Sequence, residues 1–367
     1  MRVIKKIFKV LGILLLVLIG IIAVGLICTT ILHRVRLKTN RDFLAEEGYY
    51  HPVSVGDHSL NLVRFGGNQD GHRIIALGGS GGGFPVGIDT FVSELKKENQ
   101  VYYLARPGYD GSDDVKDDMT VDFVVEEYRK ALQNGGVEAP YVLMPHSYAS
   151  LYASYWVSKY PDEIEAMINL DGSIPLKVPE EERQGAEEEL GEMGMMKTMI
   201  NLGIMDVALH VIMPPDESYS EEEQRIDDAM MLMTMGSNAF VSEMGHAMDT
   251  VETVYDMMQP NDVPKLYINA KSEMLYESIE DLKKDGLSEY RINELTEGFT
   301  GSEEERLEKA YELEWEETLK YREETWNPYF EKLGNCKLVH LPGDHFLHME
   351  QPHECAEIIL DFLKDVK

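Results

Sequence analysis

Apolar and polar residues follow two different patterns along this chain of 367 residues. An unbroken apolar run, Val10–Leu32, comes first. Residues then alternate over Tyr49–Arg64, around a turn at Gly56, as in an antiparallel pair of strands. Short apolar runs and amphipathic stretches of helical period follow each other after that. This alternation is typical of strands and helices that build a parallel, doubly wound α/β sheet.

The short apolar runs have the length of buried strands. They are His72–Leu77, Gln100–Ala105, Tyr141–Met144, Glu165–Leu170, Lys265–Ala270 and Lys337–Leu341. Amphipathic stretches predict the helices Asp89–Lys97, Thr120–Gln133, Leu151–Lys159 and Glu354–Leu363. The chain is long enough for one large α/β domain with an insertion, or for two ordinary domains.

The N-terminal apolar run predicts one transmembrane helix. Its 23 residues carry no charge and would form a helix of about 35 Å, enough for a hydrocarbon core of about 30 Å. A signal peptide would have about half this apolar length and small residues before its cleavage site. Basic residues are equally frequent on both sides, but a lone anchor before a large domain favours an extracytoplasmic domain at the cell membrane. Residues 1–41 are assigned to this anchor and to a short polar neck around Thr39–Asp42.

The strand–helix alternation stops after Asp171 and resumes at Lys265. Residues 172–262 contain 14 of the 20 methionines and predict several amphipathic helices inserted at the carboxyl edge of the sheet. Two explanations stay open, because methionine fills gaps in any core. The methionines fill an ordinary small helical core, or the helices form a cap whose apolar underside shapes a pocket for an acyl or other apolar group, and both can hold together. The α/β core is thereby divided into residues 42–171 and 263–367.

A second long section, Leu275–Lys332, follows the strand at Lys265–Ala270. Within it one apolar stripe has helical spacing: Leu307, Tyr311, Trp315 and Leu319. The stripe predicts an acidic, solvated helix that packs this face on the domain, and no chemistry follows from its charge.

The net charge of -32 argues against nucleic acid as a partner and against a peripheral domain held on anionic lipid. We assign the charge to solubility. Three cysteines, Cys28, Cys336 and Cys355, do not form a disulfide framework, and a bridge between the last two stays open.

Ser147 lies where a predicted strand turns into a predicted helix. The strand Tyr141–Met144 ends at Pro145, and the helix follows within a few residues of Ser147. Such a turn requires compact residues two before and two after the serine, where glycine is usual. Pro145 and Ala149 occupy these positions, so we predict that Ser147 is a nucleophile at this turn.

A serine nucleophile needs a base that a carboxylate orients. His345 follows the last predicted strand and is the predicted base. Two carboxylates are candidates for the acid. Glu273 follows the strand Lys265–Ala270 at the expected spacing and is preferred; Asp171 ends the preceding strand and is the alternative. Asp171 could instead cap the helix that follows it.

Two backbone N–H groups are predicted to bind the oxyanion of the tetrahedral intermediate. One is the N–H of Tyr148, the residue after the nucleophile. The other comes from the glycine-rich loop Gly78–Gly83, with Ser80 preferred and Gly79 as the alternative. The loop lacks the Gly-Lys-Ser/Thr ending of a phosphate-binding loop.

Four possible metal ligands fall within nine residues near the C-terminal end: His345, His348, Glu350 and His353. Pro352 interrupts any helix that would align them, so we predict no metal.

Four motifs, in this order, resemble those of the α/β-hydrolase superfamily. They are Gly78-Gly79-Ser80-Gly81-Gly82, Arg106-Pro107-Gly108-Tyr109-Asp110-Gly111-Ser112, Pro145-His146-Ser147-Tyr148-Ala149, and Gly343-Asp344-His345 with Glu350 and Pro352. The resemblance covers Tyr49 to Lys367 and implies the α/β-hydrolase fold, a triad of Ser147, His345 and an acid, no cofactor, and a lid between the sixth and seventh core strands. The chain departs from the family pattern in the loop histidine (here Gly78), the two elbow glycines, the glutamate at the acid position and the long Leu275–Lys332 section. Ser147 excludes the dehalogenase and epoxide-hydrolase branches, which use an aspartate nucleophile.

We therefore predict a membrane-anchored serine hydrolase that cleaves a carboxylic ester through an acyl-enzyme. Its substrate would be a small-molecule or lipid-like ester with an apolar acyl group. One alternative is a peptidase resembling proline iminopeptidases, which would need acidic residues in the cap for the substrate amine. The other is a non-catalytic α/β-hydrolase shell used for binding, and the intact Ser147 and His345 argue against it.

Overall fold

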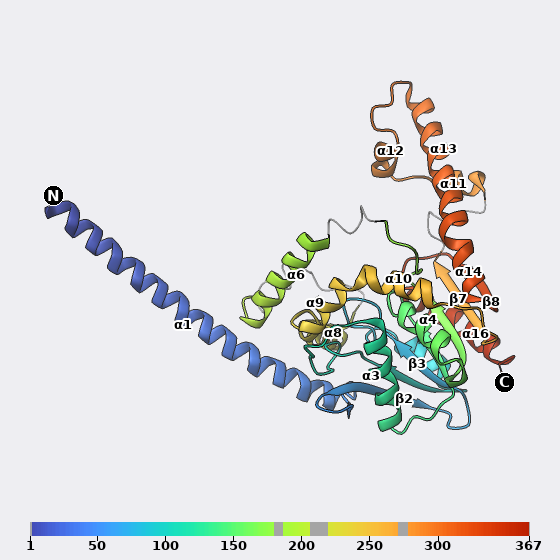
Figure 1. Ribbon diagram of the computed structural model, residues 1–367, viewed down its shortest axis with the longest axis horizontal. Coiled ribbons are helices and arrows are strands. Elements are labelled where there is room, and N and C mark those ends of the chain that lie inside the picture. Colours follow the sequence, from blue (N-terminus) through green and yellow to red (C-terminus); the bar gives the residue numbers. More distant parts are fainter. Residues whose placement is uncertain (1, 180–185, 206–218, 271–277, 367) are drawn as a thin grey trace.

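The computed structural model describes residues 2–179, 186–205, 219–270 and 278–366 (Figure 1). An eight-stranded sheet in the order β1-β2-β4-β3-β5-β6-β7-β8 forms its centre. The strands are β1 (Pro52–Ser54), β2 (Ser59–Gly67), β3 (Arg73–Leu77), β4 (Gln100–Leu104), β5 (Tyr141–Pro145), β6 (Ile164–Leu170), β7 (Lys265–Ala270) and β8 (Cys336–Leu341). Strand β2 is antiparallel to β1 and β4, and the other pairs are parallel. The prediction of a mostly parallel α/β sheet is confirmed.

Helices cover both faces of the sheet because successive strand residues face opposite sides. In β3, Ile75 and Leu77 pack in the cluster that contains α3 (Val121–Asn134) and α4 (Ala149–Lys159). Ile74 and Ala76 pack in the cluster that contains α2 (Asp89–Leu95) and α16 (Pro352–Leu363). Both faces of the central strands are thus buried, which explains why these strands are continuous apolar runs.

Helix α1 (Arg2–Glu46) extends far from the sheet (Figure 1) and is long and apolar enough to cross a membrane. It runs without a break through Thr39–Asp42, so the predicted polar neck is helical instead. The cause is tertiary packing. The last turns of α1 bury Phe43 and Leu44 against Ile226 and Met230 of α8 (Glu221–Met235).

Among the described residues, four helices lie between β6 and β7: α6 (Ala186–Asn201), α8 (Glu221–Met235), α9 (Asn238–Gly245) and α10 (Ala247–Met257). At two of these helices, α8 and α9, the sequence sets the N-terminal end through local hydrogen bonds. Ser220 and Glu223 form a capping box at α8, and the Ser237 hydroxyl accepts from the Phe240 N–H at α9. These helices are referred to below as the cap.

A helical section also lies between β7 and β8 and protrudes from the body (Figure 1). It contains α11 (Ile279–Asp285), α12 (Glu289–Leu295), α13 (Glu303–Tyr321), a π-helical turn (Arg322–Trp326) and α14 (Asn327–Leu333). The prediction about which face of α13 is buried was wrong. Leu307 and Leu319 are exposed, while Ala310, Glu314 and Thr318 are buried. Arg291 of α12 pairs with Glu314, which turns that side of α13 inward.

Two short helices complete the chain: α15 (Leu347–Glu350), and α16 as given above, after the loop that follows β8. Cys28, Cys336 and Cys355 are free thiols, so no bridge joins the last two.

Candidate functional site

Ser147 lies in a tight turn between the central strand β5 and helix α4. Its φ of 53° is in the left-handed region, which is uncommon for a residue with a side chain and is typical of a serine held at a strand-to-helix turn. Neighbouring strands fix the turn. The His146 N–H donates to the Leu77 carbonyl at 2.9 Å, and the Ser147 N–H donates to the Leu170 carbonyl at 3.2 Å. Proline has no backbone N–H to donate. The Leu77 carbonyl accepts from His146 instead, so Pro145 at this position leaves that carbonyl paired.

The structure brings His345 to Asp171. The His345 Nδ1 lies 2.6 Å from the Asp171 Oδ2, and the Ala270 N–H donates to Asp171 Oδ1 at 2.8 Å. The carboxylate is therefore held by β7 on one oxygen and faces the imidazole with the other. The preferred acid, Glu273, lies outside the described residues. The alternative, Asp171, is the carboxylate that the described part of the chain places on the histidine.

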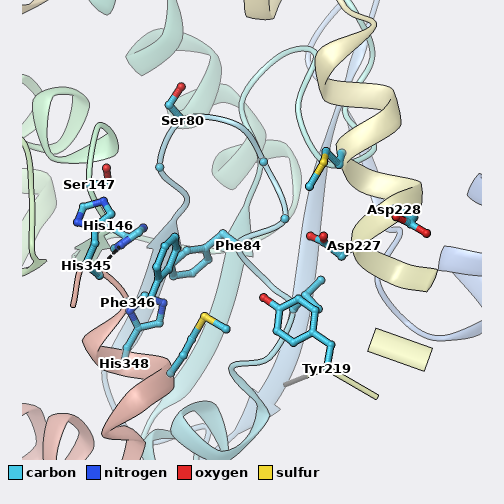
Figure 2. Close-up of a pocket in the computed structure, with 16 residues that line it drawn as sticks. Ser80, Phe84, His146, Ser147, Tyr219, Asp227, Asp228, His345, Phe346 and His348 are labelled. Atoms are coloured by element: carbon cyan, nitrogen blue, oxygen red, sulfur yellow. Dashed lines mark hydrogen bonds between the residues drawn. The ribbon is translucent and has the colours of Figure 1, made fainter. Parts of the chain in front are cut away.

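A cavity of about 330 Å³ opens beside Ser147 and His345. Figure 2 shows Ser147, His146 and His345 together at one end and Tyr219, Asp227 and Asp228 at the other. Five apolar side chains also line the cavity: Phe84, Val86, Met231, Phe346 and Met349. Asp227, Asp228 and Met231 belong to α8, so the cap forms one wall of the cavity.

The glycine-rich loop after β3 lies against the nucleophile at Gly79. A Cβ atom on Gly79 would lie 2.8 Å from the Ser147 Cβ, so only glycine allows this approach. The Ser80 hydroxyl lies 3.7 Å from the Met244 sulfur of α9 and points away from Ser147 (Figure 2). The loop is thus positioned beside the serine, and the choice between Ser80 and Gly79 as the second N–H donor, with Tyr148 as the first, stays a prediction.

His146, the residue before the serine, is buried between the nucleophile turn and the histidine loop. Its Nε2 lies 3.0 Å from the His345 carbonyl, and because a carbonyl only accepts, Nε2 carries the proton. Burial lowers the pKa of His146 to about 4, so the ring is neutral at neutral pH. The neutral ring holds the backbone of the loop that carries the base.

His348 is a second buried histidine in this region. Its ring centroid lies 4.8 Å from that of His146 and 5.3 Å from that of Phe84. Burial holds the pKa of His348 well below its ordinary value. Both histidines therefore belong to the apolar support of the site.

A buried arginine connects the glycine-rich loop to the cap. Arg106 Nη1 donates to the Gly78 carbonyl at 2.7 Å, and Nη2 donates to the Gly79 carbonyl at 2.9 Å. The same guanidinium is paired with Glu243 of α9, and both side chains are almost completely buried. Burial disfavours the charged guanidinium, but Glu243 beside it keeps the pKa of Arg106 well above its ordinary value.

Buried hydroxyls complete this network. The Tyr152 hydroxyl donates to Glu243 Oε1 at 2.6 Å, and the Tyr109 hydroxyl donates to the other carboxylate oxygen. A second buried acid, Asp110, accepts from the Gly83 N–H at 2.7 Å and from the Tyr103 hydroxyl. Two buried carboxylates thus hold the glycine-rich loop, one through Arg106 and one directly.

Among the described residues, no group of three or more His, Cys, Asp or Glu side chains is arranged to hold a metal ion. His345 is committed to Asp171, and His348 is buried beside His146. His345 and His348, which are close in sequence, therefore contact different neighbours in the structure.

Sequence reasoning did not find Arg106, Glu243, Asp110 or His146 as site residues. Arg106 and Asp110 lie in the recognised Arg-Pro-Gly-Tyr motif, which could have pointed to them. His146 also lies in a recognised motif, directly before Ser147. Glu243 has no local signal, because its burial depends on chain segments far apart in sequence.

No protein-family model matches the chain. Over 172 residues it is 33% identical to the uncharacterized protein YbdG of Bacillus subtilis (strain 168), a match that covers 47% of this chain and 52% of YbdG. The match therefore spans about half the length of that relative.

Solved structures are similar over most of the chain. Haloalkane dehalogenase DatA from Agrobacterium tumefaciens C58 aligns with a TM-score of 0.55 at 13% identity, over 86% of this chain and 96% of DatA. Haloalkane dehalogenase DbeA from Bradyrhizobium elkani USDA94 aligns with a TM-score of 0.53 at 11% identity, over 86% of this chain and 97% of DbeA. A candidate lipase (lip1) from Acinetobacter baumannii AYE aligns with a TM-score of 0.55 at 15% identity, over 91% of this chain and 96% of the lipase chain. At such identities the likeness shows the fold, and the fold of this chain is that of the α/β-hydrolase superfamily.

Proposed function

We propose that this protein is a membrane-anchored serine hydrolase that cleaves carboxylic esters through an acyl-enzyme. One observation carries the proposal. The His345 Nδ1 lies 2.6 Å from the Asp171 Oδ2 at the rim of the cavity that Ser147 lines, with Ser147 at a φ of 53°. Folding alone requires neither the strained serine nor the exposed histidine–carboxylate pair.

In the proposed first step, the Ser147 Oγ attacks the ester carbonyl carbon and its proton passes to His345 Nε2. Asp171 keeps the proton of the imidazole on Nδ1 and stabilises the imidazolium that forms. The Tyr148 N–H and an N–H of the glycine-rich loop bind the oxyanion. The intermediate collapses when His345 gives its proton to the alcohol, which leaves Ser147 acylated.

In the second step, water attacks the acyl-enzyme and gives a proton to His345. Collapse of the second tetrahedral intermediate returns that proton to Ser147 Oγ and releases the carboxylic acid. The reaction consumes one water for each ester and needs no redox partner.

The cavity supports an apolar acyl group of limited length. Its volume of about 330 Å³ lies near the lower end of the usual range for ligand pockets, about 300–1,000 Å³. Phe84, Phe346 and Met349 line the same cavity as Ser147 and His345, and apolar walls favour an apolar chain there.

The test is a series of p-nitrophenyl esters from acetate to laurate, with the full chain in detergent and Ser147→Ala as control. We expect kcat/KM to rise from acetate to a chain of medium length and to fall for laurate, with no turnover by the variant. Turnover by Ser147→Ala equal to that of the parent would exclude the proposed mechanism.

A specific observation favours aminopeptidase activity as the second candidate. Asp227 and Asp228 line the end of the cavity opposite Ser147, where carboxylates would bind a substrate ammonium group. Aminoacyl p-nitroanilides distinguish the two activities. If Asp227→Asn lowers anilide turnover at least about 100-fold (roughly 3 kcal/mol) and leaves ester turnover unchanged, the peptidase is the better description.

Membrane anchoring through α1 is the second part of the proposal. Residues Val10–Leu32 of this helix carry no charge, and their side chains are largely exposed. Extraction of the full chain from membranes by detergent but not by alkaline carbonate is the expected result. Release by carbonate would contradict it.

A further inference from the structure

The cap touches α1 inside its apolar span. The Thr29 hydroxyl donates to the Leu202 carbonyl at 2.6 Å, and the Thr30 hydroxyl lies 3.5 Å from the same oxygen. Leu202 belongs to the turn that ends α6, and both threonines belong to the uncharged run Val10–Leu32. When that run occupies a bilayer, the turn must lie at the depth of its last two helical turns.

The close approach depends on Gly203. This residue has a φ of +71°, and a Cβ atom on it would lie 2.4 Å from the Thr29 carbonyl oxygen and 3.1 Å from the His33 Cβ. Backbone therefore packs on backbone here, and a larger residue would separate the turn from α1. The contact is continued by Leu37 of α1, which packs against Ile200 of α6.

Two apolar side chains next to this contact are exposed. Ile204 in the turn is 42% exposed, and Met195 on α6 is 60% exposed. A groove of about 290 Å³ also runs along α1 beside the turn. Its lining is Leu26, Ile27, Thr30, Ile31, Arg34 and Leu202.

Arg34 is the charged group at the end of this otherwise apolar groove, two residues past the uncharged run. A guanidinium at this level lies where phospholipid phosphates lie, and the groove below it lies at the level of the acyl chains. The order of an apolar groove followed by a cation matches the order of an acyl chain and its phosphate.

We propose that the turn Leu202–Ile204 of the cap is a second membrane contact, inserted in the interface beside α1, and that the groove binds a membrane phospholipid with its phosphate at Arg34. The inference rests on the proposed membrane insertion of α1. The turn is connected to the active site, because Leu232 of α8 packs with Ile200 and α8 lines the cavity. Lipid at the turn therefore contacts the same group of helices that forms the cavity wall.

The experiment uses the full chain in vesicles of phosphatidylcholine brominated on its acyl chains, which quench nearby tryptophan. The parent contains three tryptophans, Trp156, Trp315 and Trp326, and its own quenching is subtracted as the background. Three variants that each add one tryptophan are then compared: Ile204→Trp, Leu18→Trp within the apolar run of α1, and Leu319→Trp on α13. The exposed fraction of Leu319, 47%, is similar to that of Ile204, 42%. Helix α13 lies away from α1 (Figure 1). We expect about twofold quenching of the reporters at 204 and 18, relative to unbrominated vesicles, and none at 319.

Each result decides a different statement. If the reporter at 18 is quenched and the one at 204 is not, the inference fails while the membrane anchor stands. If neither is quenched, the anchor and the inference fail together. Equal quenching at 204 and 319 would mean general adsorption of the domain and would overturn the turn as a specific contact.

Two further variants test the groove itself. Arg34→Gln in the Ile204→Trp protein should reduce the quenching by about half, because glutamine cannot form the charge-assisted hydrogen bonds that a guanidinium makes to a phosphate. Gly203→Val should reduce it further by separating the turn from α1. Unchanged quenching in Arg34→Gln would remove the phosphate site from the proposal, and unchanged quenching in both variants would overturn the groove.

Discussion

The substitution Glu243→Gln tests how the cap supports the glycine-rich loop. Glu243 is completely buried, and Arg106 beside it is 2% exposed. Glutamine keeps the shape and can still accept from Tyr109 or Tyr152, but it removes the negative charge opposite the guanidinium. A buried cation without its counterion costs about 3–5 kcal/mol, or roughly 10²–10⁴ in the folding equilibrium.

The effect on catalysis should follow from the same contacts. Arg106 also donates to the carbonyls of Gly78 and Gly79, and Gly79 lies against Ser147. One oxyanion donor is worth about 10²–10³ in rate, so partial misplacement of the loop should lower kcat by about 10–100-fold. We expect a smaller change in KM, because the cavity walls around the acyl group are unchanged.

The first assay is urea unfolding, monitored by tryptophan fluorescence. The second is kcat on a p-nitrophenyl ester, measured at a urea concentration far below the unfolding midpoint. Glu314→Gln is the matched control. Glu314 is a buried glutamate paired with an arginine, Arg291, whose side chain is 24% exposed and also contacts Glu294 and Glu317. The control should lose about 1 kcal/mol or less and keep its kcat.

A double variant separates stability from positioning. Arg106→Met with Glu243→Leu replaces the buried pair by apolar side chains, which is often neutral or stabilising. Stability should return towards that of the parent, while kcat stays low because the Gly78 and Gly79 carbonyls have lost their donor. Parent-like kcat in the double variant would refute the positioning role.

Asp171→Asn should lower kcat about 10⁴-fold, and Glu273→Gln less than about tenfold. A larger loss in Glu273→Gln than in Asp171→Asn, measured by steady-state kinetics, would identify Glu273 as the triad acid. His146 binds a proton more readily in the unfolded state, so between pH 6.5 and about 4 stability should fall as the pH falls, by at most about 3 kcal/mol. Urea midpoints at pH 7 and pH 5 should differ less in His146→Gln than in the parent, and an equal difference would contradict the neutral buried imidazole.

Much of the sheet could be predicted from sequence because buried parallel strands are continuous apolar runs. The predicted run Lys265–Ala270 coincides with β7, and Gln100–Ala105 exceeds β4 by one residue. Helix ends were less certain where tertiary packing decides them. The polar residues Thr39–Asp42 suggested a neck, but Phe43 and Leu44 just after them pack on α8 and extend the helix.

The site was predictable where the backbone itself carries the signal. The strand-to-helix turn at Ser147 and the position of His345 after the last strand follow from chain order. The identity of the acid does not, because Asp171 and Glu273 both follow strands at the same edge of the sheet. Only the three-dimensional arrangement shows Ala270 and His345 converging on Asp171.

Labelling with a fluorophosphonate tests the central claim most directly. The full chain in detergent should form a single adduct on Ser147, located by mass spectrometry. Ser147→Ala should form none, and Asp171→Asn should react much more slowly. Folded parent protein that forms no adduct on Ser147 would contradict the assignment of this site as a serine hydrolase centre.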